Sequence, residues 1–129
     1  MASIFSRIIA GEIPSYKLYE DEYVYAFLDV FPQQKGHTLI VPKIEIDHFA
    51  DVPEPHYSAI FQAAKKLSKP LQEVTGCKRI CTVFAGYEVP HTHYHLVPTN
   101  SQEDLHFKKT EQASAEELAA LQKSILAIL

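Results

Sequence analysis

Several features of common protein classes are missing from this chain of 129 residues. It contains only four glycines, and none of them belongs to a glycine-rich phosphate loop. No run approaches the roughly 20 apolar residues that a membrane-spanning helix needs. The apolar run at the start is interrupted by Arg7 and Glu12, which is not the pattern of a signal peptide. The sequence therefore predicts no membrane partner.

Cysteine is also scarce, with two residues in the whole chain. Cys77 and Cys81 are four positions apart, which is not the Cys-x-x-Cys spacing of redox and metal pairs. We expect two free thiols in a reducing compartment, which favours the cytoplasm. A redox pair is the alternative.

Basic charge is in deficit, because 12 lysines and arginines face 16 acidic residues and the net charge is −4. Binding to a nucleic-acid backbone requires a basic face, so we expect no nucleic-acid partner. Hydrophobic residues make up 47% and charged residues 22% of the chain, as in ordinary globular proteins. A chain of this length fits one domain, which we expect to cover residues 1–129.

Hydrophobic periodicity and capping residues predict an α+β fold with an about five-stranded, mostly antiparallel sheet, one long helix and terminal helices. Ser3 and the Ser114-to-Glu117 capping box mark the starts of the terminal helices. Pro70 should end or kink the long helix. The expected helices cover 3–10, 53–75 and the segment after 114, and the expected strands cover 16–20, 23–29, 37–41, 78–84 and 91–97.

Histidine is the abundant exception, with seven residues in the chain. Three of them alternate in the segment His91-Thr92-His93-Tyr94-His95. In a strand, alternate side chains lie on one face at intervals of ~6.5 Å. Three imidazoles so placed on a partly buried face cannot all carry a charge without a large cost. We expect them to share protons, to hold a metal or to meet an anion.

Three interpretations of this row are open. It can be a structural or solvated face. It can bind a metal, since His-x-His is a good pair of zinc or iron ligands and Glu88 or His37 can add another. It can also hold a nucleophilic imidazole whose second nitrogen is fixed by an acceptor and whose neighbours assist the chemistry.

The chain resembles the histidine triad (HIT) family over nearly its whole length. The resemblance rests on IFSRIIAGEIPS (4–15), on EDEYVYAFLDVFPQQKGHTLIVPK (20–43), on EVPHTHYHLVP (88–98) and on their order. It implies a homodimeric α+β fold that binds nucleotides beside the triad strand. It also implies transfer of a nucleotidyl group through a covalent histidine intermediate, with no cofactor.

The resemblance also assigns roles to individual residues. His93 would attack the α-phosphorus of a nucleotide, with its other ring nitrogen held by a backbone oxygen. His95 would hydrogen-bond the phosphoryl oxygens or the departing group, and His91 and His37 would support the other two histidines. Phosphoryl transfer of this kind depends mainly on positioning and charge stabilisation, so it can proceed without a metal.

A second group of residues matches the nucleotide-binding positions of the family. Asp29 would accept the ribose hydroxyls, although it can also be a turn cap. An apolar wall around the base, which can equally be plain core, and a turn beside the phosphate complete the group. The wall comprises Phe5, Ile8, Phe27 and Val30, and the turn comprises Gly86, Tyr87, Glu88 and Val89.

The chain departs from the family pattern in two places. Many members carry zinc ligands in a Cys-x-x-Cys near the start, where this chain has Ser3 and Ser6, so we expect no such zinc and no metal in the site. Tyr87 and Glu88 stand where many members have a glutamine and a hydroxyl residue. Glu88 would repel the phosphate or carry a proton to an amine leaving group.

Together these features predict a nucleotide hydrolase or nucleotidyl transferase. Its substrates would be nucleoside phosphoramidates or dinucleoside polyphosphates, and the resemblance favours purine nucleotides. The alternatives are a nucleotide-binding regulatory protein with weak or no turnover, motivated by Tyr87 and Glu88, and a histidine-ligated metalloenzyme.

Overall fold

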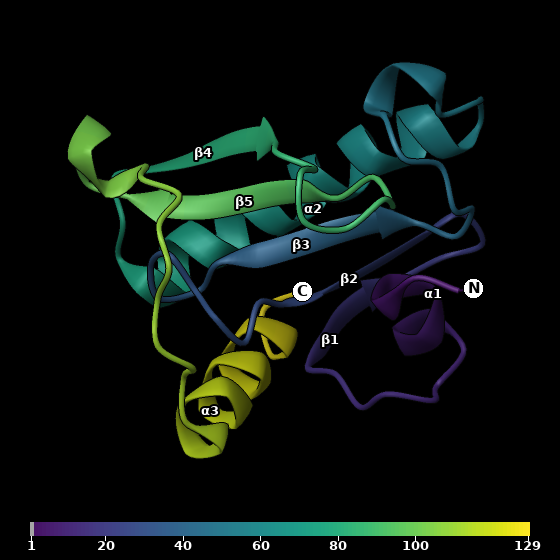
Figure 1. Ribbon diagram of the computed structural model, residues 1–129. Coiled ribbons are helices and arrows are strands. Elements are labelled where there is room, and N and C mark those ends of the chain that lie inside the picture. Colours follow the sequence, from purple (N-terminus) through teal and green to yellow (C-terminus); the bar gives the residue numbers. More distant parts are fainter. Residues whose placement is uncertain (1) are drawn as a thin grey trace.

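A computed structural model describes residues 2–129, and its strands form one antiparallel five-stranded sheet in the order β1-β2-β3-β5-β4 (Figure 1). The strands are β1 (Lys17–Glu20), β2 (Val24–Leu28), β3 (Thr38–Pro42), β4 (Arg79–Phe84) and β5 (Tyr94–Thr99). The helices are α1 (Ile4–Ile9), α2 (His56–Thr75) and α3 (Ala115–Leu126), with single 3₁₀ turns at Phe49–Asp51 and Gln102–Asp104. The predicted α+β class is confirmed.

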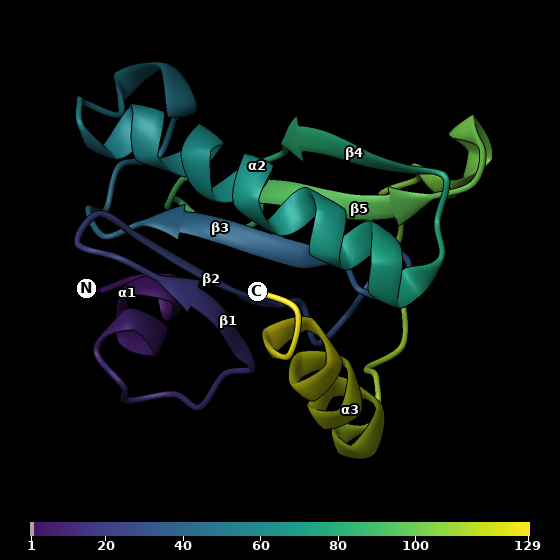
Figure 2. The same ribbon diagram turned by 180° about the vertical axis from the view of Figure 1, so that it is seen from behind.

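The long helix α2 covers one face of the sheet, and Figure 2 shows it in front of β2, β3 and β5. Its apolar stripe includes Ile60, Leu67 and Leu71, which are all fully buried. These side chains pack in one cluster with Ile40 and Leu96 from the sheet and with the apolar side of α3. This larger cluster is the main core of the molecule.

The other face of the sheet carries α1, with a smaller apolar cluster beneath it. Alternate side chains of β2 and β3 point to this side, among them Phe27 and Leu39, and they meet Phe5 and Ile8 of α1. Every residue of β2 and β3 is therefore buried, because both of their faces are covered. The triad histidines lie on this α1 side of the molecule.

The predicted helix signals act as expected at both ends of the chain. The Ser3 hydroxyl accepts the Ser6 N–H, and the Ser114 hydroxyl accepts the Glu117 N–H, so each serine is an N-cap. Helix α2 begins at His56 rather than at residue 53, and it continues through Pro70 to Thr75 instead of ending there. None of the helices in residues 2–129 combines the length and apolarity that crossing a membrane would require.

The predicted strand 91–97 is wrong at its start, because β5 begins at Tyr94. Its pairing with β3 ends where Tyr94 faces Ile40. Just before that point, the N–H and the hydroxyl of Thr92 both donate to the carbonyl oxygen of Ile46, at 2.7 Å each. These bonds draw the chain away from the ladder, so His91 and His93 lie on an irregular segment and only His95 lies in the strand.

Gly36 fixes the approach of the loop before β3 to the end of α2. Its φ of +89° lies in the left-handed region that favours glycine. A Cβ at this position would lie 2.7 Å from Cγ2 of Thr75 and 3.3 Å from Cγ of Pro98. The glycine that precedes His37 is therefore required both by its backbone conformation and by the space around it.

We predict that Gly36→Ala lowers the free energy of unfolding by about 2–4 kcal/mol, from left-handed strain plus steric overlap. Gly11→Ala is the matched control, because Gly11 has a φ of +81° but no atom of the described residues 2–129 within 4 Å of its added Cβ. It should cost only the strain, about 1 kcal/mol. Urea unfolding measures both variants, and equal losses would show that the contact with Thr75 is unimportant.

Candidate active site

His93 lies at the centre of the candidate site, with its side chain buried. Its Nδ1–H donates to the carbonyl oxygen of His91 at 2.8 Å. A carbonyl oxygen only accepts, so this contact places the proton on Nδ1 and leaves the lone pair of the neutral ring on Nε2. The ring packs against Phe5, with a distance of 5.0 Å between ring centroids. His93 is thus held in the tautomer that a nucleophilic imidazole needs.

A second histidine pair lies beside it. The backbone N–H of Gln33 donates to Nδ1 of His37 at 2.9 Å, so the proton of a neutral His37 is on Nε2. That Nε2–H then donates to Nδ1 of His95, also at 2.9 Å. The proton of a neutral His95 must therefore be on Nε2.

Burial keeps this pair uncharged at neutral pH. It lowers the pKa of His37 to about 3, and the neighbouring His95 and His93 add to the shift. It lowers the pKa of His95 to about 4, again with a contribution from His93, and the nearby backbone of Ala85 offsets part of this shift. Burial also lowers the pKa of His91. At pH 7 the site therefore offers these three rings as neutral donors and acceptors.

One donor of this network is unused. Nε2 of His95 is buried and finds no hydrogen-bond partner among residues 2–129. Its ring centroid lies 5.0 Å from that of His93. A buried N–H without a partner carries a free-energy cost of about 1–3 kcal/mol, which a bound acceptor would remove. The site thus combines a free lone pair on His93 with a free N–H on the adjacent His95.

His91 is fully buried and links two other elements. Its Nε2–H donates to the carbonyl oxygen of Pro42 at 2.8 Å, and its Nδ1 accepts the Ser3 hydroxyl at 2.7 Å. Ser3 and Ser6 stand where the resemblance to the HIT family implies zinc-binding cysteines. Their hydroxyls offer no thiolate and are engaged in hydrogen bonds, so this donor set does not fit a structural zinc ion.

Asp29 follows β2 and lies beside the histidine pair, with Oδ2 at 3.8 Å from Nε2 of His37. Burial raises the pKa of Asp29 to about 6, partly offset by the Phe31 N–H that Oδ1 accepts at 2.9 Å, and the charge of Glu88 adds to the rise. One ligand atom each of Asp29, His37 and His95 lie within 4.8 Å of one another. The alternative of a histidine-ligated metal therefore has residues that could serve it.

The predicted apolar wall is brought together only in part. Phe5, Ile8 and Phe27 pack in the cluster under α1, whereas Val30 packs against the larger cluster on the α2 side. The turn predicted to bind phosphate, residues 86–89, lies mostly at the surface. Gly86, Tyr87 and Glu88 are exposed, and Val89 packs against the α1 cluster.

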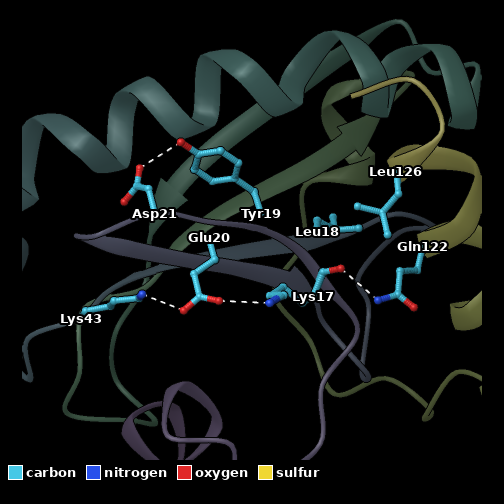
Figure 3. A pocket seen from close by; sticks show the side chains of 8 residues that line it. All are labelled: Lys17, Leu18, Tyr19, Glu20, Asp21, Lys43, Gln122 and Leu126. Carbon is cyan, nitrogen blue, oxygen red and sulfur yellow. Dashed lines mark hydrogen bonds and ion pairs between the residues drawn. The ribbon is translucent and has the colours of Figure 1, made fainter.

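Of two cavities in the structure, one is lined in part by histidines and the other is not. One of about 300 Å³ adjoins the site, and it is lined by Asp47, His48, Phe49, Phe84, Gly86, Tyr87, Thr92 and His93. The larger one, of about 550 Å³, lies between β1 and α3 (Figure 3). Three of its charged groups pair with each other, because Glu20 binds Lys17 at 3.0 Å and Lys43 at 2.6 Å, and Asp21 accepts the Tyr19 hydroxyl. It contains none of the predicted site residues.

Sequence reasoning missed three contributors to the site. Phe107 comes from a polar segment without any motif, yet its ring covers His95 at 4.8 Å and His37 at 6.2 Å. Gln33 acts through its backbone N–H, for which no sequence pattern exists. His48 matches no motif but lines the cavity beside His93. Of the three, only Gln33 lies next to a recognisable motif, in the loop that leads to Gly36.

These features define a class: an antiparallel α+β fold with a buried cluster of four histidines at the end of a sheet. The chain belongs to the HIT family, since its residues 10–102 match the model of the HIT domain. It is 34% identical to the adenosine 5'-monophosphoramidase HNT1 of Saccharomyces cerevisiae over 131 residues, covering 99% of this chain and 83% of that protein. It is 40% identical to an uncharacterized HIT-like protein of Methanocaldococcus jannaschii over 103 residues, covering 74% of this chain and 77% of the relative.

Solved structures agree with this assignment. A Hit-like protein from Bartonella henselae, described as involved in cell-cycle regulation, superimposes with a TM-score of 0.87 at 29% identity. The match covers 98% of this chain and 96% of that one. A HIT family member from Bacillus subtilis gives a TM-score of 0.75 at 32% identity, covering 100% and 98% of the two chains.

We predict that Asp29→Asn raises the free energy of unfolding at pH 7 by about 1–3 kcal/mol. The folded protein holds the Asp29 proton up to a pKa of about 6, whereas an unfolded chain releases it near 3.8. The stability of the wild type therefore falls as the pH rises through this window. The asparagine side chain of the variant has no proton to lose and still offers its Oδ1 to the Phe31 N–H.

Urea unfolding at pH 7 and at pH 3.5 measures this effect, and the gain should vanish at the lower pH. Glu88→Gln is the control variant, because it removes only the secondary charge that raises the pKa of Asp29. It should give a smaller gain of the same sign. A gain of equal size at both pH values would contradict the assignment to the Asp29 proton.

Proposed function

We propose that this protein is a nucleotide hydrolase or nucleotidyl transferase of the HIT family, with His93 as the nucleophile. The observation that carries the proposal is that two adjacent histidine rings each offer a group to a ligand, one an acceptor and the other a donor. His93 has its Nδ1–H bound to a carbonyl oxygen, which leaves the Nε2 lone pair available. The buried Nε2–H of His95, next to it, lacks a partner among residues 2–129. A phosphorus centre that carries an anionic oxygen would satisfy both groups.

In the proposed reaction Nε2 of His93 attacks the α-phosphorus of a nucleoside phosphoramidate or a dinucleoside polyphosphate. A bond forms between Nε2 and phosphorus, and the bond to the leaving group breaks. The His95 N–H donates to a phosphoryl oxygen or to the departing atom. Glu88, which is exposed on the turn above, would carry the proton that an amine leaving group takes up. Water then attacks phosphorus, releases His93 and yields the nucleoside monophosphate.

The remaining site residues would position the nucleoside. Asp29 would accept the ribose hydroxyls. The α1 cluster around Phe5 and Phe27 would contact the base, and the backbone N–H groups of Gly86 to Val89 would bind phosphate oxygens. The name of the yeast relative, an adenosine 5'-monophosphoramidase, supports an adenosine phosphoramidate as the first substrate to test. No cofactor enters this scheme.

We predict that the protein releases AMP from adenosine 5'-phosphoramidate and that His93→Ala lowers the rate on the order of a thousandfold or more, since the covalent nucleophile is lost. His106→Ala is the matched control, because His106 is exposed and matches no site position. Mass spectrometry of acid-quenched enzyme should find an AMP adduct on the peptide that contains His93.

Two outcomes would favour the alternatives. Full activity in His93→Ala, or activity that is lost on chelation and restored by a stoichiometric metal, would favour a metalloenzyme built on Asp29, His37 and His95. Tight nucleotide binding without turnover on both substrate classes would favour a regulatory protein, which is the alternative that Tyr87 and Glu88 motivate.

We further propose that the protein is a homodimer that joins through β4 and α2. Within residues 2–129, β4 pairs only with β5, so its other edge is open. An aromatic cluster lies beside this edge: Phe49 stacks on Phe84, and Phe61 packs edge-on against Tyr94. Phe49 is 37% and Phe61 39% exposed, so apolar surface is accessible beside the open edge.

Sedimentation should therefore give twice the chain mass of 14.6 kDa, and Phe61→Glu should shift the protein to the monomer, because a charge would be buried at the interface. Leu129→Glu is the control, since Leu129 is similarly exposed at the C-terminal end. A wild type of 14.6 kDa in solution would contradict this proposal.

A further inference from the structure

The segment that carries His93 is not held by the sheet. Pairing between β3 and β5 begins at Ile40 and Tyr94, so the residues before Tyr94 have no ladder to fix them. The carbonyl oxygen of His91 nevertheless has to stand 2.8 Å from Nδ1 of His93 to set its tautomer. The bonds from Thr92 to the Ile46 carbonyl hold the chain on one side of this group, and a second contact holds His91 itself.

The imidazole of His91 provides this contact, because its two nitrogens bind two different elements. Nε2–H donates to Pro42, the last residue of β3, and Nδ1 accepts the hydroxyl of Ser3, the N-cap of α1. Both nitrogens are used, one as donor and one as acceptor, which is possible only for the neutral ring with its proton on Nε2.

The chain of hydrogen bonds continues from Ser3 to a carboxylate. The Ser3 oxygen accepts the Ser6 N–H at 3.0 Å. Its proton goes to Nδ1 of His91 at 2.7 Å rather than to Oγ of Ser6, which lies 3.4 Å away. The backbone N–H of Ser3 and the hydroxyl of Ser6 both donate to Oε1 of Glu45, at 2.7 Å each. Glu45 follows β3 by three residues, so this carboxylate ties the start of α1 to the same strand end that binds His91.

Every bond in this chain has a defined direction. The Ser6 proton is committed to Glu45, so Ser6 does not compete as the donor to Nδ1 of His91, from which it lies 3.4 Å away. The backbone N–H of Ser3 is also bound to Glu45, which holds Ser3 in the position from which its hydroxyl donates to His91. The hydrogen bonds from Ser3 and Ser6 also lower the pKa of Glu45, so its carboxylate stays charged as an acceptor.

We propose that Ser3, Ser6 and Glu45 form a positioning cluster for the triad. The carbonyl oxygen of Pro42 places the proton of His91 on Nε2, and the cluster holds the ring in that position from the Nδ1 side. Through the His91 carbonyl it also fixes the ring of His93. A network of hydroxyl and carboxylate hydrogen bonds thus joins α1 to the triad. The inference rests on the proposed function only where it concerns the rate.

The first test is ¹⁵N NMR of the histidine rings, which reports tautomers without requiring any activity. In the wild type, His91 should be locked with its proton on Nε2 and His93 with its proton on Nδ1. Ser3→Ala removes the hydroxyl that holds Nδ1, so the His91 ring should move away from the Pro42 carbonyl for part of the time and exchange between tautomers. The His93 signals should shift with it. Ser114→Ala is the matched control, because it removes the N-cap of α3 without touching a histidine, and it should leave both rings unchanged.

The second test separates positioning from substrate binding. Ser3→Ala and Glu45→Ala should each lower kcat for AMP release about tenfold, the loss expected for one hydrogen bond, with KM little changed. Ser3→Thr keeps the donor and Glu45→Gln keeps the acceptor oxygen, so both should restore most of the rate. Glu45 is exposed, so its variants are informative even if Ser3→Ala unfolds α1.

The two proposals fail in different ways. Wild-type tautomers of His91 and His93 in both Ser3→Ala and Glu45→Ala would overturn the positioning cluster whatever the enzyme does. No AMP release by the wild type, with the tautomers shifted in these variants, would overturn the proposed function and leave the cluster standing. Equal loss of rate in Ser114→Ala and Ser3→Ala would show a general effect of helix stability and would also overturn the cluster.

Discussion

The candidate site depends on the hydrogen bond between the His93 Nδ1–H and the carbonyl oxygen of His91. This bond decides which nitrogen of His93 keeps its lone pair, and it exists only while the backbone of His91 stays in place. His91 is held through both nitrogens of its own ring, by Pro42 on one side and Ser3 on the other. The small helix α1 and the end of β3 therefore converge on one imidazole, and the chemistry of the site depends on that convergence.

Burial acts on the same rings in a second way. Taking His37 and His95 out of water lowers their pKa values far below the ordinary range of histidine, to about 3 and about 4. The pair therefore stays neutral at pH 7, and its hydrogen bonds fix which ring nitrogen carries each proton. Starting from the Gln33 N–H, each hydrogen bond fixes the position of the next proton. The last proton is on Nε2 of His95, which has no hydrogen-bond partner among residues 2–129. Asp29 shows the opposite effect of the same burial, because its pKa rises to about 6.

The local sequence pattern predicted where most of the helices and strands lie, but it predicted the candidate site only in part. Ser3 and Ser114 cap helices where their sequences predict, because a cap involves only residues within one turn. Alternation placed His91, His93 and His95 in one strand, but Thr92 leaves the ladder for the Ile46 carbonyl, a residue 46 positions away. Pro70 did not end α2, since the packing of Leu67 and Leu71 in the main core outweighs the one hydrogen bond that proline removes.

By itself the sequence determined most of the strand and helix pattern and the spacing of the triad, because these depend on neighbours along the chain. Only the tertiary structure decided which nitrogen of each histidine carries the proton. It also brought Phe107 over His95 and joined Ser3 and Glu45 to His91. The reason is physical: a tautomer is set by the partner across the ring, and those partners come from segments that meet only when the sheet, α1 and the loops have packed.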